Sequence, residues 1–154
     1  MCSSDLGWTA LAEPMGERMA RLGWPADVVA ERTAYVPVPL AAARQRERGF
    51  NQAELLARAV ARRQARPVWA DVLRRERFSA TQTRLTPSER AANVHQAFHV
   101  SPVARARIAG THLVLVDDVL TTGATLNAAA TVLFEAGARI ISYLTFGRAR
   151  SARD

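Results

Sequence analysis

The chain has 154 residues, 49% of them hydrophobic, which is enough for the core of one domain, and its apolar stretches are too short to span a membrane. A secretory start is missing, and the single cysteine, Cys2, excludes a disulfide framework and a cysteine-ligated zinc site, so a soluble cytoplasmic protein is expected. The net charge is +7 and all 21 basic residues are arginine, which suits nucleic acid or an anionic substrate without separating the two.

The start of the chain differs from the rest. Residues 2–6 resemble nothing downstream, and their coding sequence would look like sequencing-adapter DNA joined to a truncated reading frame. We therefore expect residues 1–8 to be non-native or disordered, residues 9–150 to form one domain and residues 151–154 to be a tail.

The domain is predicted to open with a helix and a strand. Apolar residues recur at helical spacing from Thr9 to Leu22, and the well-formed part of this helix is expected to begin near Pro14. Residues 33–40 are β-rich around Tyr35 and Val36, and the two prolines that follow predict an extended exit from the strand.

That exit leads into an arginine-rich loop, residues 44–52, at the carboxyl end of the strand. Its guanidinium groups suit a diphosphate, which they hold in bidentate fashion, although a solvated basic loop is the alternative. Asn51 is the predicted N-cap of a helix that runs to about Gln64, and the preceding glycine permits an unusual turn. The candidate pyrophosphate-binding residues are Arg44, Arg48, Gly49, Asn51 and Gln52.

The middle of the chain is less regular. Residues 68–73 predict a second strand, residues 97–100 a short strand, and residues 101–110 a basic connection. Between the two strands lies a polar segment without an apolar face, which predicts a flexible loop that includes Thr81, Gln82 and Arg84. The alternative is a surface loop that opens a short helix.

Residues 112–125 carry the strongest motif of the chain. An apolar run from His112 to Val116 predicts a strand buried on both faces, which ends before Asp117 and Asp118. The turn Thr121, Thr122, Gly123, Ala124 and Thr125 then begins a helix, and its hydroxyl and N–H groups suit a phosphate. The neighbouring acids suit sugar hydroxyls or Mg²⁺, whereas a solvated acidic turn is the alternative.

The end of the chain completes an alternation of strands and helices. Leu126, Ala129, Ala130, Leu133 and Phe134 predict the buried face of a helix that stops at Gly137, and residues 139–148 predict a last strand. We predict an α/β fold with three layers, in which a mostly parallel central sheet has helices on both faces.

Two stretches resemble known families. Residues 114–125, VLVDDVLTTGAT, resemble the ribose-phosphate motif of type I phosphoribosyltransferases. Residues 36–40, VPVPL, the spaced arginines and residues 48–57, RGFNQAELLA, are similar to the ComF (GntX) family, which is associated with competence for DNA uptake. The resemblance implies a type I phosphoribosyltransferase-like fold that binds phosphoribosyl pyrophosphate.

The same resemblance implies roles for the candidate residues. The turn Thr121 to Thr125 would bind the 5-phosphate, and Asp117 and Asp118 would take the ribose hydroxyls directly or through Mg²⁺ as cofactor. The loop 44–52 would meet the pyrophosphate, and the flexible loop would close over the substrate. This chain departs from the family in having neither the N-terminal four-cysteine zinc module nor a lysine for the pyrophosphate.

Two functions follow from the resemblance. The first is a phosphoribosyltransferase, a glycosyltransferase of nucleotide metabolism, with an unidentified acceptor. The second is a binding protein in DNA uptake with little or no turnover, whose arginines contact single-stranded DNA or a helicase partner. A homodimer is left open as an assembly.

Overall fold

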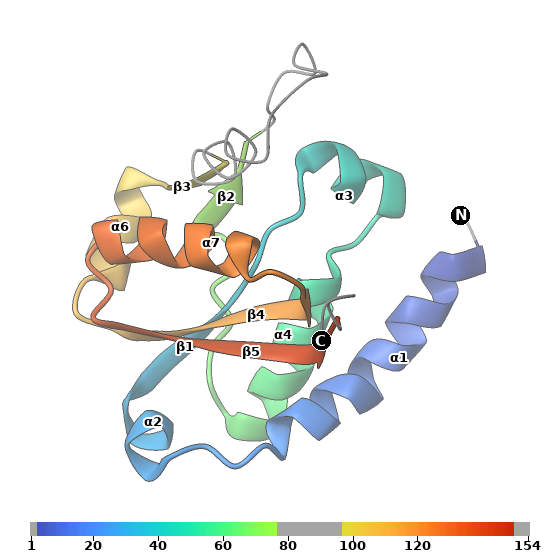
Figure 1. Ribbon diagram of the computed structural model, residues 1–154, viewed down its shortest axis with the longest axis horizontal. Helices are drawn as coiled ribbons and strands as arrows, with labels where there is room; N and C mark the ends of the chain where they lie inside the picture. The colour runs from blue at the N-terminus through green and yellow to red at the C-terminus, as the bar shows by residue number, and fades with distance from the viewer. Residues whose placement is uncertain (1–2, 77–96, 150–154) are drawn as a thin grey trace.

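The computed structural model describes residues 3–76 and 97–149, and its centre is a parallel sheet (Figure 1). The strands are β1 (Arg32–Pro37), β4 (His112–Leu120) and β5 (Ile140–Arg148), in the order β1-β4-β5. Arg32 of β1 pairs with His112 of β4, which pairs in turn with Ile140 of β5. The predicted α/β class with a parallel central sheet is confirmed.

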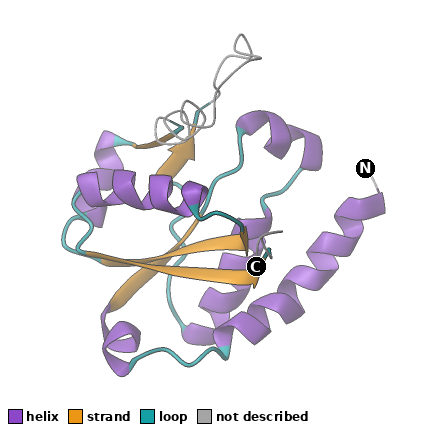
Figure 2. Ribbon diagram, viewed as in Figure 1, coloured by secondary structure: helices purple, strands orange, loops and turns teal. Residues whose placement is uncertain are grey.

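Helices cover both faces of this sheet, as Figure 2 shows. On β4, Leu113 and Leu115 pack in the cluster with α6 (Pro102–Ile108) and α7 (Ala124–Glu135). Val114 and Val116 pack on the opposite face with α1 (Ser3–Ala20) and α4 (Gln52–Gln64). All four of these β4 side chains are fully buried, as expected for a central parallel strand. Over residues 3–76 and 97–149, no helix is both long and apolar enough to cross a membrane.

The two remaining short strands form a separate antiparallel ribbon. Leu73–Arg75 (β2) pairs with Phe98–Val100 (β3), so the predicted strand at residues 97–100 is confirmed. The predicted strand at residues 68–73 is wrong, because the chain follows β1 only at a single bridge between Tyr35 and Val68. It then turns at residues 70–71, and the strand starts at Leu73 in another direction.

Three short helices were not predicted. Residues 102–108, expected as a connection, form α6, whose N-cap Ser101 accepts a hydrogen bond from the Ala104 N–H at 3.3 Å. Part of the predicted loop 44–52 forms α3 (Ala42–Arg48), which ends at Gly49. The third short helix, α2 (Ala26–Glu31), leads into β1.

The first helix is longer than predicted. It begins at Ser3, and Pro14 lies inside it on the exposed side, where the proline does not interrupt packing. On the inner face of this helix, Gly16 leaves no room for a side chain. A Cβ added at Gly16 would lie only 2.3 Å from the Ala59 Cβ of α4. The backbones of α1 and α4 therefore approach closely. The native or non-native origin of residues 1–8 stays a prediction.

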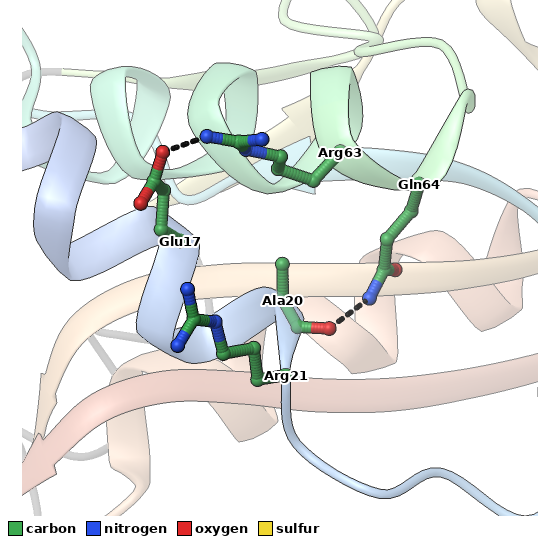
Figure 3. A pocket seen from close by; sticks show the side chains of 5 residues that line it. All are labelled: Glu17, Ala20, Arg21, Arg63 and Gln64. Atoms are coloured by element: carbon green, nitrogen blue, oxygen red, sulfur yellow. Dashed lines mark hydrogen bonds and ion pairs between the residues drawn. The ribbon is translucent and has the colours of Figure 1, made fainter.

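Charged side chains complete the contact between α1 and α4. Ion pairs join Arg62 to Glu13 and Arg63 to Glu17, and the Gln64 Nε2 donates to the Ala20 carbonyl at 2.8 Å. A hollow of about 140 Å³ lies beside the pairs Arg63–Glu17 and Gln64–Ala20. Figure 3 shows the residues that line it, which are Glu17, Ala20, Arg21, Arg63 and Gln64. None of the predicted site residues that the structure describes lines this hollow.

Candidate functional site at the carboxyl edge of the sheet

The paired acids lie inside β4 and not after it. The strand stays in register with β5 beyond Val116, because Asp117 pairs with Thr145 and Leu120 pairs with Arg148. The strand was predicted to end before the acids, and this is wrong because β4 continues to Leu120. Both carboxylates are consequently held on a rigid, hydrogen-bonded strand.

The turn after β4 is shaped by one glycine. Gly123 has φ of 79°, in the left-handed region, and it immediately precedes α7. The Thr122 Oγ1 accepts a hydrogen bond from the Ala124 N–H at 3.4 Å, and Thr121 and Thr122 are exposed. Because the first N–H groups of a helix have no acceptor within the helix, this turn presents donors to solvent.

Asp117 and the turn share one hollow at the surface. Its volume is about 20 Å³, and it is lined by Asp117, Val119, Leu120, Thr121, Gly123, Thr125 and Leu126. This volume has room for a group the size of a water molecule. A larger anion would rest at the mouth of the hollow, against the exposed hydroxyls. Among the residues predicted for the phosphate and ribose, Asp118, Thr122 and Ala124 do not line the hollow.

Electrostatics distinguish the two acids. The pKa of Asp117 is raised to about 6, mainly by burial and also by the neighbouring Asp118 carboxylate. The Asp118 N–H, which donates to the Asp117 Oδ1 at 2.9 Å, and the charge of Arg75 oppose this rise. The Val119 N–H donates to the Asp118 Oδ1 at 2.7 Å. Each carboxylate therefore has one oxygen that accepts from the backbone and a second oxygen that does not.

The donor set suits Mg²⁺ only together with a ligand. Within the described part of the chain, three or more metal-binding side chains nowhere come together. Two carboxylates are nevertheless what Mg²⁺ commonly takes from a protein when substrate phosphates and water complete its shell. The raised pKa of Asp117 also indicates a place where a cation would relieve the cost of a buried charge.

The predicted pyrophosphate residues divide into two groups. Arg44 and Arg48 are exposed on α3, and Gly49 ends that helix with φ of 77°. Asn51 and Gln52 are buried, at 7% and 5% exposure. Asn51 and Gln52 are therefore positioned to hold the segment in place, whereas the arginines face solvent.

The Asn51 side chain shows how this frame is built. Its Oδ1 accepts from the Ala53 N–H at 3.1 Å, which confirms the predicted N-cap, and its Nδ2 donates to the Val38 carbonyl at 3.0 Å. The Val38 N–H donates in turn to the Val116 carbonyl at 2.9 Å, directly before the acids. The arginine-bearing segment thus leaves the sheet beside the carboxyl end of β4.

Sequence reasoning missed Arg75. This residue lies on β2, and its guanidinium carbon is 5.3 Å from the centroid of the Phe98 ring. Burial lowers the pKa of Arg75, Arg44 lowers it further, and Asp117 raises it, so the charges of both predicted subsites act on this side chain. The predicted flexible-loop residues Thr81, Gln82 and Arg84 lie outside the described residues.

A comparison with protein families gives this geometry a context. The model of the phosphoribosyl transferase domain matches residues 47–154, which include the acids, the turn and α4. The chain belongs to the phosphoribosyl transferase domain family. Within that family, the predicted likeness to ComF proteins is confirmed by curated relatives.

Two relatives illustrate the likeness. Competence protein F of Haemophilus influenzae is 35% identical over 75% of this chain and 50% of its own length. The DNA utilization protein YhgH of Escherichia coli is 37% identical over 69% of this chain and 45% of its own length. This phosphoribosyl transferase domain chain therefore spans about half the length of the curated relatives it matches.

The fold is also found in solved structures. Glutamine phosphoribosylpyrophosphate amidotransferase of B. subtilis, in a complex with ADP and GMP, aligns with a TM-score of 0.61 and 19% identity. The alignment covers 90% of this chain and 26% of that enzyme chain. This likeness confirms the predicted type I phosphoribosyltransferase fold of the domain.

Proposed function

We propose that this chain binds phosphoribosyl pyrophosphate and transfers its phosphoribosyl group to an acceptor. The observation that carries the proposal is that Asp117 and the turn with Thr121, Gly123 and Thr125 line one hollow. That hollow lies at the carboxyl edge of a parallel sheet, where open α/β folds bind their ligands. Membership of the phosphoribosyl transferase domain family supports the same substrate.

The roles follow from the chemistry of each group. The Thr121 and Thr122 hydroxyls and the N–H groups at the start of α7 bind the 5-phosphate. Asp117 and Asp118 accept hydrogen bonds from the ribose hydroxyls through the carboxylate oxygens that the backbone leaves free. Arg44 and Arg48 meet the pyrophosphate, and Asn51 and Gln52 hold the segment in position.

Mg²⁺ fits the same arrangement as a proposed cofactor. Asp117 and Asp118 would hold it together with oxygens of the ligand, and it would supply charge neutralisation for the pyrophosphate. In this role the acids position and balance charge, and they do not transfer a proton.

The reaction places modest demands on the protein. The bond between the ribose C1 and the pyrophosphate oxygen breaks, and its electron pair leaves with the pyrophosphate. The acceptor donates a pair to C1 and loses its proton to solvent. The site accelerates this exchange by orienting the ribose and by stabilising charge on the leaving group.

The direct test is turnover. The chain is incubated with phosphoribosyl pyrophosphate, Mg²⁺ and a panel of purine and pyrimidine bases, and released pyrophosphate is measured. We expect release with at least one base, its loss in Asp118→Asn, and its retention in Asp71→Asn. Asp71 is a suitable control because it is an exposed acid whose partner is Arg107, away from the site. No release with any base would refute the transferase.

A second candidate is supported by a different observation. The net charge is +7, α3 exposes three arginines without an ion pair to a described carboxylate, and similar proteins are named for competence and DNA utilization. We propose as the alternative a binding protein in DNA uptake that contacts single-stranded DNA or a helicase. Salt-dependent retention of an oligonucleotide is expected. Absence of retention at low salt would exclude the DNA contact.

A further inference from the structure

The amino edge of the sheet, opposite the candidate site, holds a buried cation without a counter-ion. Arg32 opens β1 and is only 7% exposed, and its Nε and Nη1 atoms are buried without a hydrogen-bond partner. No ion pair among the described residues includes Arg32. Buried charges in folded proteins are normally paired, because a guanidinium that leaves water loses its hydration. The position of Arg32 therefore favours a ligand of opposite charge.

A buried histidine lies beside this arginine. His112 of β4 is the register partner of Arg32, so the two side chains lie on one face of the sheet, with backbones about 4.8 Å apart. His112 is 1% exposed, its Nε2 lies 2.9 Å from the Ser142 Oγ, and its Nδ1 is buried without a partner. Burial lowers the pKa of His112, so the ring is neutral near pH 7. When the Ser142 hydroxyl donates to Nε2, the ring proton sits on Nδ1, and His112 presents a donor beside those of Arg32.

The acids near this edge do not neutralise Arg32. Glu31 precedes it in the chain, but the Glu31 carboxylate pairs with Arg139 at 2.8 Å. Asp27 belongs to α2, which Figure 1 shows where the chain enters β1, and it forms no ion pair with Arg32. The described residues around Arg32 thus supply further donors but no anionic acceptor that contacts it.

We propose that Arg32 and His112 bind a small oxyanion at the amino edge of the sheet. A sulfate, a phosphate or a carboxylate would supply the missing negative charge and would accept hydrogen bonds from both side chains. Trp24 packs on the same face of the sheet, and its Nε1 is a further buried donor without a partner. The inference does not rest on the proposed function, because β4 rises about 16 Å between His112 and Asp117.

Thermal unfolding of the full chain tests this site. Sodium sulfate or sodium acetate is titrated in at constant ionic strength, with sodium chloride as the balancing salt and the reference. Because a ligand that binds only the folded state stabilises it, an excess of about tenfold over Kd should raise Tm by about 3 to 6 °C above the value in chloride. The rise should saturate as the site fills.

Matched variants identify the residues responsible. Arg32→Met keeps the length of the side chain without its charge, so it should abolish the rise and should have a higher Tm than the unmodified chain in chloride. Arg58→Gln loses the same charge at an exposed arginine paired with Glu54, and it should keep the rise. Ser142→Ala removes the hydroxyl that orients His112 and should weaken anion binding several-fold. This last variant keeps the test usable if Arg32→Met does not fold.

One further variant separates this site from the turn at the other end of β4. Gly123→Ala alters that turn and should keep the rise. A rise that is lost in Gly123→Ala and kept in Arg32→Met would place the anion at the turn, which overturns this inference and leaves the proposed function standing. No rise above chloride in the unmodified chain, or an equal rise in every variant, would also overturn it.

The two anions identify the kind of ligand. An Arg32-dependent rise with acetate alone supports a carboxylate at this edge, and one with sulfate alone supports a tetrahedral anion. Either result supports the site, and it does so whether or not the chain releases pyrophosphate from phosphoribosyl pyrophosphate.

Discussion

Replacing Asp117 by asparagine measures how much the half-buried charge of this carboxylate lowers the free energy of unfolding. Burial and the Asp118 charge raise the pKa of Asp117 from 3.8 to about 6. Because the pKa is higher in the folded state than in the unfolded chain, the neutral carboxyl stabilises the fold fully below about pH 4. This stability is lost as the pH rises through about 6, where the folded protein acquires a poorly solvated charge.

The magnitude follows from the size of the shift. A rise of about 2 units corresponds to about 3 kcal/mol at about 1.4 kcal/mol per unit. Since Asp117 is only partly buried, solvent screening lowers this to about 1.5 to 2 kcal/mol. The asparagine side chain introduced by Asp117→Asn would carry no charge, and its amide oxygen would still accept the hydrogen bond that the Asp118 N–H makes at 2.9 Å.

Urea unfolding of the ligand-free proteins at several values between pH 4 and pH 8 measures this effect. At pH 8, Asp117→Asn should be more stable than the unmodified chain by about 1.5 to 2 kcal/mol, and the difference should shrink toward pH 4. Asp118→Asn is the control, because removing the neighbouring charge should lower the pKa of Asp117 and flatten the pH dependence. Parallel stability curves for the unmodified chain and Asp117→Asn would refute the reasoning.

Three further substitutions test the frame of the site. Gly123→Ala puts a side chain on a residue in the left-handed region, so it should lower the free energy of unfolding in urea by about 1 to 2 kcal/mol. It should also weaken ribose 5-phosphate binding, and unchanged binding would contradict the role of the turn. Asn51→Ala removes a cap and a buried hydrogen bond and should cost about 1 to 3 kcal/mol by the same assay, whereas an effect below about 0.5 kcal/mol would contradict it. Gly16→Ala brings a Cβ against Ala59 and should lower the melting temperature, while Gly7→Ala, which meets no atom within 4 Å, should not.

The parts of the fold that sequence could predict are those in which local chemistry and tertiary packing agree. The run from His112 to Val116 is buried on both faces of the sheet, as its uninterrupted apolarity predicts. Asn51 caps α4, and Gly137, with φ of 100°, follows α7, so both helix ends obey local rules.

The parts that sequence did not predict depend on partners distant in the chain. Asp117 and Asp118 remain in a strand because β5 continues to pair with β4 from Asp117 to Leu120, which no local signal encodes. Phe134, predicted on the buried face of α7, is 50% exposed because Ala130 and Leu133 already fill the contact with the sheet.

The central claim is that a phosphorylated ribose binds where β4 passes into α7. The most direct test is thermal unfolding of the chain titrated with phosphoribosyl pyrophosphate and Mg²⁺, with unphosphorylated ribose as the control ligand. A ligand at a hundredfold excess over its Kd adds about 2.7 kcal/mol, which is a rise of about 5 to 10 °C in Tm for a chain of this size. We expect such a rise with phosphoribosyl pyrophosphate, no rise with ribose, and no rise with phosphoribosyl pyrophosphate in Gly123→Ala. A Tm that does not move at any concentration of phosphoribosyl pyrophosphate would contradict it.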